Sequence, residues 1–308
     1  PVRSVSWCPN PQFRILAIAA GTHLFLLAPS FLPGPATTAA QSMISETVEK
    51  VQKRKSKEEA IWRLATEQEQ QILGCGSDAN KQQGPVVVVD HLLDIAQCQW
   101  HHKGDYIAAL IQKDVAQPVR STAIFVHRVS TGVSQKFQVA NPKGATGIQC
   151  FAFHPIQPRI FIATQRIVRL YDLSKGRRGS SLVKKAYSHC RWIASLSVHP
   201  SGNHVIIGTY DRRVCWFDMD LACDKPWKVM RHHHQAVRRV AFSPKFPLFA
   251  SCSDDGHTHL FHASVPADTF DTPTLVPLRG LHGHGVTEDL GVLSSCFHRT
   301  LRWLFTAG

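Results

Sequence analysis

A repeated strand pattern in the second half of the chain constrains the fold more than any other feature. Three stretches, Cys150–Leu173, Ile193–Met219 and Val237–Ala263, each hold an apolar strand ending in His-Pro or Ser-Pro, a turn, a second apolar strand, a polar turn and a strand with an aromatic tip. The prolines of the three first turns lie 45 and 44 residues apart. A period of about 40–45 residues is typical of repeats that each form one four-stranded blade of a β-propeller.

Weaker copies of the pattern flank these three repeats. Val5–Pro9 and Cys98–His102 carry it upstream, and Cys296–His298 followed by Leu301–Phe305 carries it downstream. The sequence therefore predicts six blade starts in an all-β propeller.

Both ends of the chain fall inside a blade in this interpretation. Pro1 begins on an innermost strand, and Gly308 follows the second strand of the last repeat. A propeller removes its exposed sheet edges by closing the ring. We therefore expect residues 1–308 to form a single propeller domain that is truncated at both ends. The parent protein would add a blade upstream and one or two strands downstream, giving seven blades.

The segment between Ala28 and Asp90 interrupts the blade period, because 93 residues separate Pro9 from His102 where one repeat needs roughly half that number. We predict an insertion over residues 30–85 within an early blade. It should open as a proline-rich loop over 29–35 and then form a helix that starts at a Ser56–Glu59 capping box. The apolar residues at helical spacing in this predicted helix are Ala60, Ile61, Leu64, Ala65 and Ile72.

The basic run Lys50–Lys57 of this insertion allows two interpretations. It could be a nuclear-import or RNA-contacting segment, or it could be the solvated face of a helix. Val86–Val89 then returns the chain to the sheet.

Composition is that of a packed globular chain, with 44% hydrophobic and 19% charged residues. No run of about 18 apolar residues is long enough to span a membrane. The N-terminus has no secretory pattern, and the nine cysteines occur singly, without a Cys-x-x-Cys pair. The cytosol or the nucleus is the expected compartment.

Basic residues exceed acidic ones by 35 to 22, a net charge of +13 that attracts polyanions. Between Arg166 and Arg191 there are eight basic residues and a single acid, Asp172. RNA or a ribonucleoprotein is the expected polyanion, because no helix-turn-helix or zinc-finger motif is present and structured RNA is recognised through shape and phosphates. The alternative is that these side chains only keep the loops soluble. The predicted RNA contacts are Arg177, Arg178, Lys184, Lys185, Arg212, Arg213, Arg238 and Arg239.

Two histidines stand where WD repeats place a histidine that hydrogen-bonds the aspartate of the next turn. His189 and His233 each lie four residues before the first inward apolar residue, and Asp211 and Asp255 occupy the corresponding turns. Phenylalanine replaces tryptophan six residues after each aspartate. We predict degenerate WD repeats in which these four residues form a structural, incomplete polar network.

The sequence lacks the common catalytic and metal-binding motifs. The sequence has no Gly-x-x-x-x-Gly-Lys loop, no Gly-x-Ser-x-Gly elbow and no His-Glu-x-x-His helix. The triplet His232–His234 has no carboxylate or cysteine at ligand spacing nearby. We therefore expect a protein that is not an enzyme and that needs no metal or other cofactor.

Seven segments outside the insertion around 31–85 share one further likeness. They are Pro1–Pro11, Trp100–Ala108, Trp192–Gly202, Gly208–Asp218, Arg231–Phe242, Pro247–Gly256 and Asp289–Val292. Through them, most of the chain resembles the C-terminal WD-repeat propeller of the block-of-proliferation proteins, which are eukaryotic ribosome-biogenesis factors.

The resemblance implies a scaffold of the nucleolus and nucleoplasm. It implies binding to a pescadillo-family protein, mainly through regions upstream of the propeller, and to a second WD-repeat protein that carries a ubiquitin-like domain. The complex would process large-subunit pre-rRNA and mature the pre-60S particle. The propeller itself would retain the contact with the second WD-repeat protein and any contact with pre-rRNA.

A substrate receptor of a ubiquitin ligase is the alternative function for such a propeller. Those receptors resemble one another in a Trp-Asp-x-Arg motif at the end of a blade. The equivalent positions here, Tyr171–Ser174 and Phe217–Asp220, lack the arginine. A propeller enzyme would instead need acids or metal ligands around its central channel.

Overall fold

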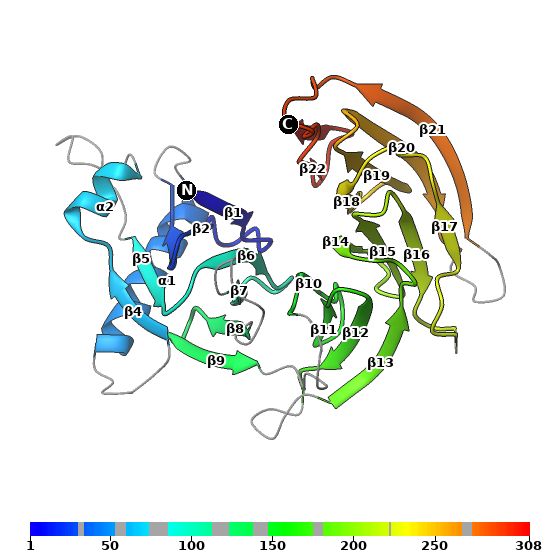
Figure 1. Cartoon of the computed structure of the whole chain (residues 1–308). Helices are drawn as coiled ribbons and strands as arrows, with labels where there is room; N and C mark the ends of the chain where they lie inside the picture. Colours follow the sequence, from blue (N-terminus) through cyan, green and yellow to red (C-terminus); the bar gives the residue numbers. More distant parts are fainter. Residues whose placement is uncertain are drawn as a thin grey trace. The chain divides into compact units, whose positions relative to one another are not determined.

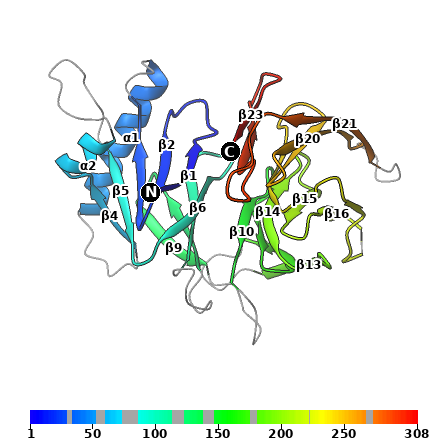
Figure 2. The same cartoon turned by 45° about the horizontal axis from the view of Figure 1, so that its top comes forward.

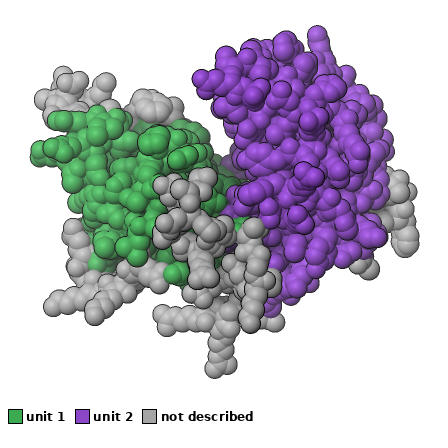
Figure 3. All heavy atoms as spheres, in the orientation of Figure 1, with its two compact units in different colours: residues 1–147 green, residues 148–308 purple. Residues whose placement is uncertain are grey.

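A computed structural model describes most of the chain as antiparallel sheets. The described residues are 1–29, 34–52, 60–73, 86–112, 123–137, 147–174, 181–221, 223–266 and 273–308. These residues form six sheets, which confirms the predicted all-β fold with six blade starts (Figure 1). The chain divides into two compact units, Pro1–Gly147 and Ile148–Gly308 (Figure 3). Whether residues 1–308 act as one domain stays a prediction.

Unit 1 contains two sheets and two helices. Its first sheet has five strands in the order β1-β2-β3-β5-β4, and its second has four strands in the order β6-β7-β8-β9. The strand bounds are Val2–Trp7 (β1), Leu16–Ala20 (β2), His23–Leu27 (β3), Ala60–Leu64 (β4), Val87–His91 (β5), Ile95–Trp100 (β6), Tyr106–Ile111 (β7), Ala123–Arg128 (β8) and Val133–Phe137 (β9). The helices are Pro35–Gln52 (α1) and Glu67–Ile72 (α2).

Unit 2 contains three four-stranded sheets, each with its strands in sequence order, and one two-stranded sheet. Its strands are Cys150–Phe153 (β10), Arg159–Ala163 (β11), Ile167–Asp172 (β12), Ser181–Tyr187 (β13), Ile193–Val198 (β14), His204–Thr209 (β15), Val214–Asp218 (β16), Lys228–Met230 (β17), Val237–Phe242 (β18), Leu248–Ser253 (β19), His257–Ser264 (β20), Thr274–His282 (β21), Ser294–Phe297 (β22) and Leu304–Ala307 (β23).

Strand β16 shows why the middle strands of these sheets consist mostly of apolar residues. Successive side chains of a strand point to opposite faces of its sheet. Trp216 belongs to the core shared with β18–β21, whereas Cys215 and Phe217 belong to the core shared with β10–β13. Because both faces of the sheet are buried there, residues 214–217 are all apolar, and the polar Asp218 comes only at the partly exposed end of the strand.

Neighbouring sheets are joined by serine side chains on their first strands. In unit 2, Ser195 Oγ of β14 accepts the Val240 backbone N–H of β18 at 3.0 Å, and Ser197 Oγ accepts that of Phe242 at 3.0 Å. In unit 1, Ser4 Oγ of β1 accepts a backbone N–H of β6 at 3.1 Å. These bonds satisfy inner-strand donors that the sheet's own ladder leaves unpaired.

The insertion folds differently from the sequence prediction. Ala60–Leu64 is the edge strand β4, paired with β5, and not the start of a helix. Ala60 and Trp62 are buried while Ile61 is 63% exposed, which is the alternation of a strand. The helix prediction was wrong because a short apolar run fits both periods, and pairing with β5 decided between them.

The two helices begin at places that the sequence analysis did not choose. Pro35, expected in a loop, is the first residue of α1, where its fixed φ and missing N–H are favourable. Thr66 and Glu69 form the capping box of α2. The predicted cap Ser56–Glu59 lies outside the described residues, as does most of the basic run after Lys50. Helix α1 packs on the first sheet through Ala40, Ile44 and Val48 (Figure 2).

Neither α1 nor α2 has the length and apolar character that a helix needs to cross a membrane.

A buried histidine of unit 1 makes its stability sensitive to acid. The His91 ring is 7% exposed, and neither of its nitrogens has a hydrogen-bond partner among the described residues. It lies 5.2 Å from the Phe125 ring and 5.0 Å from the His127 ring. Burial lowers the pKa of His91 to about 4, and the nearby charge of Asp90 only partly opposes this shift. His91 is therefore neutral in the folded protein at pH 7.

We expect the free energy of unfolding to fall as the pH drops from 7 to 5. An unfolded histidine with a pKa near 6.5 takes up its proton in this range, whereas folded His91 does not, so protonation favours the unfolded state. The contribution of His91 should be about 2 kcal/mol at pH 5. Urea unfolding at both pH values measures it. His91→Phe should show a correspondingly smaller loss, and an equal loss in the variant would contradict this assignment.

Candidate binding surface

A polar network holds the turn between β19 and β20. His233 Nδ1 lies 3.1 Å from Asp255 Oδ2, and His233 Nε2 lies 2.8 Å from Ser251 Oγ. Asp255 also accepts the backbone N–H groups of His234 at 2.8 Å and His257 at 3.0 Å. Because a carboxylate can only accept, Nδ1 of His233 carries the proton and Nε2 accepts from the serine hydroxyl. The structure thus brings together the predicted pair, His233 and Asp255.

The protonation states of this network agree with its hydrogen bonds. Burial lowers the pKa of His233 to about 4, so the ring is neutral at pH 7. Burial opposes ionisation of Asp255, but the His234 and His257 backbone N–H groups together with the His233 ring hold the pKa of that carboxyl below its usual value. Ser251 was missed by the sequence analysis. The signal was present, since a serine in the preceding strand, four residues before the turn aspartate, faces the same interior.

The corresponding pair of the preceding repeat is not formed. His189 is exposed, with a left-handed φ of 53°. Asp211 instead lies 3.3 Å from the Arg213 guanidinium. The position that holds Ser251 in the next repeat is occupied here by Ile207, so an inward histidine would have no hydroxyl to bond. The prediction that His189 contacts Asp211 was therefore wrong.

The predicted RNA contacts fall into separate groups. Lys184 and Lys185 lie on β13, the edge strand of its sheet. The ammonium of Lys184 donates to the backbone carbonyls of Met219, at 2.7 Å, and Leu221. It is thus already engaged within the protein, and burial lowers its pKa. Lys185 is exposed. Outside the described residues lie two further predicted contacts, Arg177 and Arg178.

The other predicted arginines come from the β15–β16 turn and from β18. Arg212 is exposed at the tip of the turn, with a φ of 66°. Arg213 follows it and pairs with Asp211. Arg239 is exposed on β18. Arg212 and Arg239 therefore present their charge to solvent, whereas that of Arg213 is partly neutralised.

An exposed aromatic pair lies beside these arginines and was not found from the sequence. Trp192 and Tyr210 are 41% and 45% exposed, and their ring centroids are 6.4 Å apart at an interplanar angle of 81°. Trp192 Nε1 donates to Gln149 Oε1 at 2.9 Å. The Arg238 guanidinium lies 5.1 Å from the Tyr210 ring centroid and is anchored by Asp254, at 2.7 and 2.9 Å. We call this cluster the Trp192–Tyr210–Arg238 surface.

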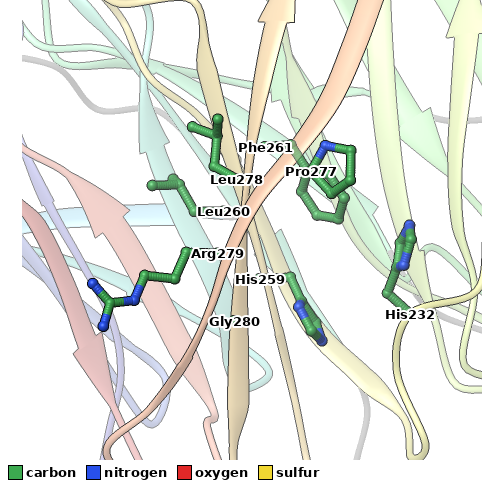
Figure 4. A pocket seen from close by; sticks show the side chains of 8 residues that line it. All are labelled: His232, His259, Leu260, Phe261, Pro277, Leu278, Arg279 and Gly280. Atoms are coloured by element: carbon green, nitrogen blue, oxygen red, sulfur yellow. The ribbon is translucent and has the colours of Figure 1, made fainter.

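A pocket of about 170 Å³ lies between the segment before β18 and strands β20 and β21 (Figure 4). The His232 ring is 6.0 Å from that of His259 and 5.3 Å from that of Phe261. The Arg279 side chain points away from the two histidines (Figure 4). Burial lowers the pKa of His259. No carboxylate, thiol or hydroxyl is among the described side chains that line this pocket; its ionisable groups are the imidazoles of His232 and His259 and the guanidinium of Arg279.

Within the described part of the chain, no group of three or more His, Cys, Asp or Glu side chains is placed to hold a metal ion.

The comparisons with known proteins agree with this arrangement of sheets. The family described as WD domain, G-beta repeat matches residues 180–218 and 224–262. The whole chain is 40% identical to "Ribosome biogenesis protein ERB1" of Malassezia globosa and 38% identical to "Ribosome biogenesis protein bop1" of Danio rerio. It is 36% identical to "Ribosome biogenesis protein erb1" of Schizosaccharomyces pombe, again over its full length.

Over its full length the chain is similar to proteins named Bop1 and Erb1 ribosome biogenesis proteins. The resemblance described from the sequence and the WD40 type of the fold are thereby confirmed. The chain spans about a third of the length of the Bop1/Erb1 relatives it matches, 34% in the Malassezia protein and 38% in the fission yeast protein.

Proposed function

We propose that this chain is a non-catalytic scaffold segment in the assembly of the large ribosomal subunit, acting in the nucleolus and nucleoplasm. The observation that carries the proposal is the match of the entire chain to proteins named for ribosome biogenesis, at 35–40% identity. Identity at this level extends through both units, so it supports a shared role and not only a shared repeat type.

The surface chemistry supports a binding role. The net charge of +13 favours association with a ribosomal RNA precursor, and the exposed Lys185, Arg212 and Arg239 are available for phosphate contacts. The buried His233 of the β19–β20 network is neutral because burial lowers its pKa, and its ring is fixed by hydrogen bonds to Asp255 and Ser251. It therefore serves to fix a loop that flanks the exposed surface.

The proposed partners follow from the same family relationship. They are a second WD-repeat protein with a ubiquitin-like domain, a pescadillo-family protein and the pre-60S particle with its large-subunit pre-rRNA. Because the chain spans about a third of its relatives, we assign the pescadillo-family contact mainly to regions outside it. The second WD-repeat protein and the pre-rRNA are the contacts that we assign to this segment.

Affinity purification of the tagged full-length protein tests this proposal. We expect pre-60S proteins, the second WD-repeat protein and large-subunit pre-rRNA at moderate salt. RNA held mainly by phosphate contacts should diminish in high salt. An untagged strain provides the control. Recovery of cullin-ligase components without ribosomal precursors would instead support the ubiquitin-ligase receptor and overturn the proposal.

A further inference from the structure

The Trp192–Tyr210–Arg238 surface has a chemistry that phosphate binding alone does not require. We propose that it is a base-stacking site that binds unpaired nucleotides of RNA. This inference rests on the proposed function, because it names the form of RNA that the scaffold would hold. It adds two aromatic residues to a set of contacts that the sequence analysis limited to arginine and lysine.

The exposure of the aromatic pair is the first argument. Trp192 and Tyr210 leave 41% and 45% of their surface in contact with solvent, although Trp216 in the same sheet is fully buried. In a perpendicular pair, each ring has at least one face that its partner does not cover. Such an uncovered face is the surface on which a base can stack, and every base offers a π face in return.

The fixed position of these rings is the second argument. The Trp192 indole N–H is bonded to Gln149 Oε1 at 2.9 Å, and the backbone N–H of Tyr210 donates to the Trp192 carbonyl at 3.0 Å. Arg238, over the Tyr210 ring, is held by two hydrogen bonds to Asp254. The rings are therefore ordered before any ligand arrives, which reduces the entropic cost of binding.

The positive charge around the aromatic pair is the third argument. Positive charge alone would suit RNA and an acidic peptide equally, but positive charge beside exposed aromatic rings suits RNA. The carboxylates of the adjoining turns are each engaged inside the protein, by Arg213, Arg238 and the His233 network. Arg191 precedes Trp192 in the chain, Arg212 lies at the tip of the β15–β16 turn, and both are exposed. In the described part of the chain, neither of them has a side-chain hydrogen bond or ion pair. The surface thus combines cations with stacking faces.

Unpaired RNA fits this surface better than a duplex does. In an RNA helix the bases are stacked on one another, so their faces are unavailable to a protein ring. A duplex could contact the arginines, but it could not use Trp192 and Tyr210. Comparing the affinities for unpaired RNA and for a duplex therefore separates the contribution of the aromatic rings to binding from that of the arginines.

Fluorescence anisotropy with the full-length protein tests the inference. The probes are a short labelled oligouridine and a blunt RNA duplex of equal length. We expect Trp192→Ala and Tyr210→Ala each to weaken oligouridine binding by roughly tenfold. Duplex affinity and the salt dependence of binding should stay unchanged. Arg212→Glu should weaken both probes and flatten the salt dependence, with a slope reduced by about 0.7–0.9.

Two control variants show whether a loss of oligouridine binding is specific to the aromatic face of Trp192. Trp303 is 57% exposed in the β22–β23 turn, against 41% for Trp192, so Trp303→Ala removes an even more exposed indole elsewhere and should leave the binding of both probes unaffected. Trp192→Phe keeps an aromatic face and should restore most of the oligouridine affinity. Thermal unfolding of each variant shows whether it remains folded.

Three outcomes would overturn the inference. Unchanged oligouridine affinity in both alanine variants would remove the stacking site while leaving the proposed scaffold role intact. Binding of neither probe by the wild type would remove the site as well. Displacement of oligouridine by a polyglutamate peptide whose own binding depends on Trp192 would reassign the surface to an acidic protein partner. Co-purification of pre-60S components judges the proposed function separately from all three.

Discussion

Replacing Trp216 with alanine is expected to lower the free energy of unfolding by about 3–5 kcal/mol. The Trp216 side chain is fully buried, and its ring lies 5.4 Å from that of Phe242 and 5.8 Å from that of Phe249. Its Nε1 donates to His204 Nδ1 at 3.2 Å. The substitution removes a large volume from the core that joins β14–β17 to β18–β21, and it leaves the His204 nitrogen without a donor.

Trp216→Phe separates these two effects. Phenylalanine fills much of the indole volume but cannot donate to His204, so the expected loss is about 1–2 kcal/mol. Urea unfolding monitored by circular dichroism gives both values. Similar losses for the two variants would show that the hydrogen bond outweighs packing, contrary to our expectation. A loss below about 1 kcal/mol for alanine would contradict the burial of this core.

Replacing Asp255 with alanine is expected to destabilise the protein by about 2–4 kcal/mol. The carboxylate side chain is 7% exposed and accepts from the His233 ring and from two backbone N–H groups. Its removal leaves the buried His233 ring and the two backbone N–H groups without their acceptor. The β19–β20 turn should loosen, and because Asp254 of that turn anchors Arg238, the effect should extend to the aromatic surface.

Asp211→Ala is the matched control, because Asp211 occupies the same turn position of the preceding repeat without a complete network. The described side-chain partner of Asp211 is Arg213, at 3.3 Å, and this ion pair is partly exposed. The free energy of unfolding should therefore fall by at most about 1 kcal/mol. Equal losses at the two aspartates would show that the histidine and serine contribute nothing. Denaturant midpoints of the two variants decide the question.

The repeat period was enough to predict the six sheets, because the apolar runs recur at a fixed spacing and middle strands such as β11, β15 and β19 are buried on both faces. The insertion was harder. Ala60–Leu64 is too short for its periodicity to distinguish a helix from a strand, and its strand conformation comes from pairing with β5, which lies more than twenty residues later in the chain.

The candidate site was predictable only where a repeat keeps all of its network residues. His233 contacts both Asp255 and Ser251, whereas His189 is exposed and Ile207 stands at the position equivalent to Ser251. Trp192 lies directly before β14 and Tyr210 directly after β15. In the sequence, a tryptophan at the start of an apolar strand could equally belong to the core. Its exposure became evident from the fold alone.

Sequencing the RNA that co-purifies with the tagged full-length protein at moderate salt tests the central claim most directly. The account predicts strong enrichment of large-subunit rRNA precursors over the untagged control, together with pre-60S proteins. Small-subunit precursors should not be enriched to the same degree. RNA indistinguishable from the untagged control, in a preparation that retains its protein partners, would contradict an RNA-bound scaffold in large-subunit assembly.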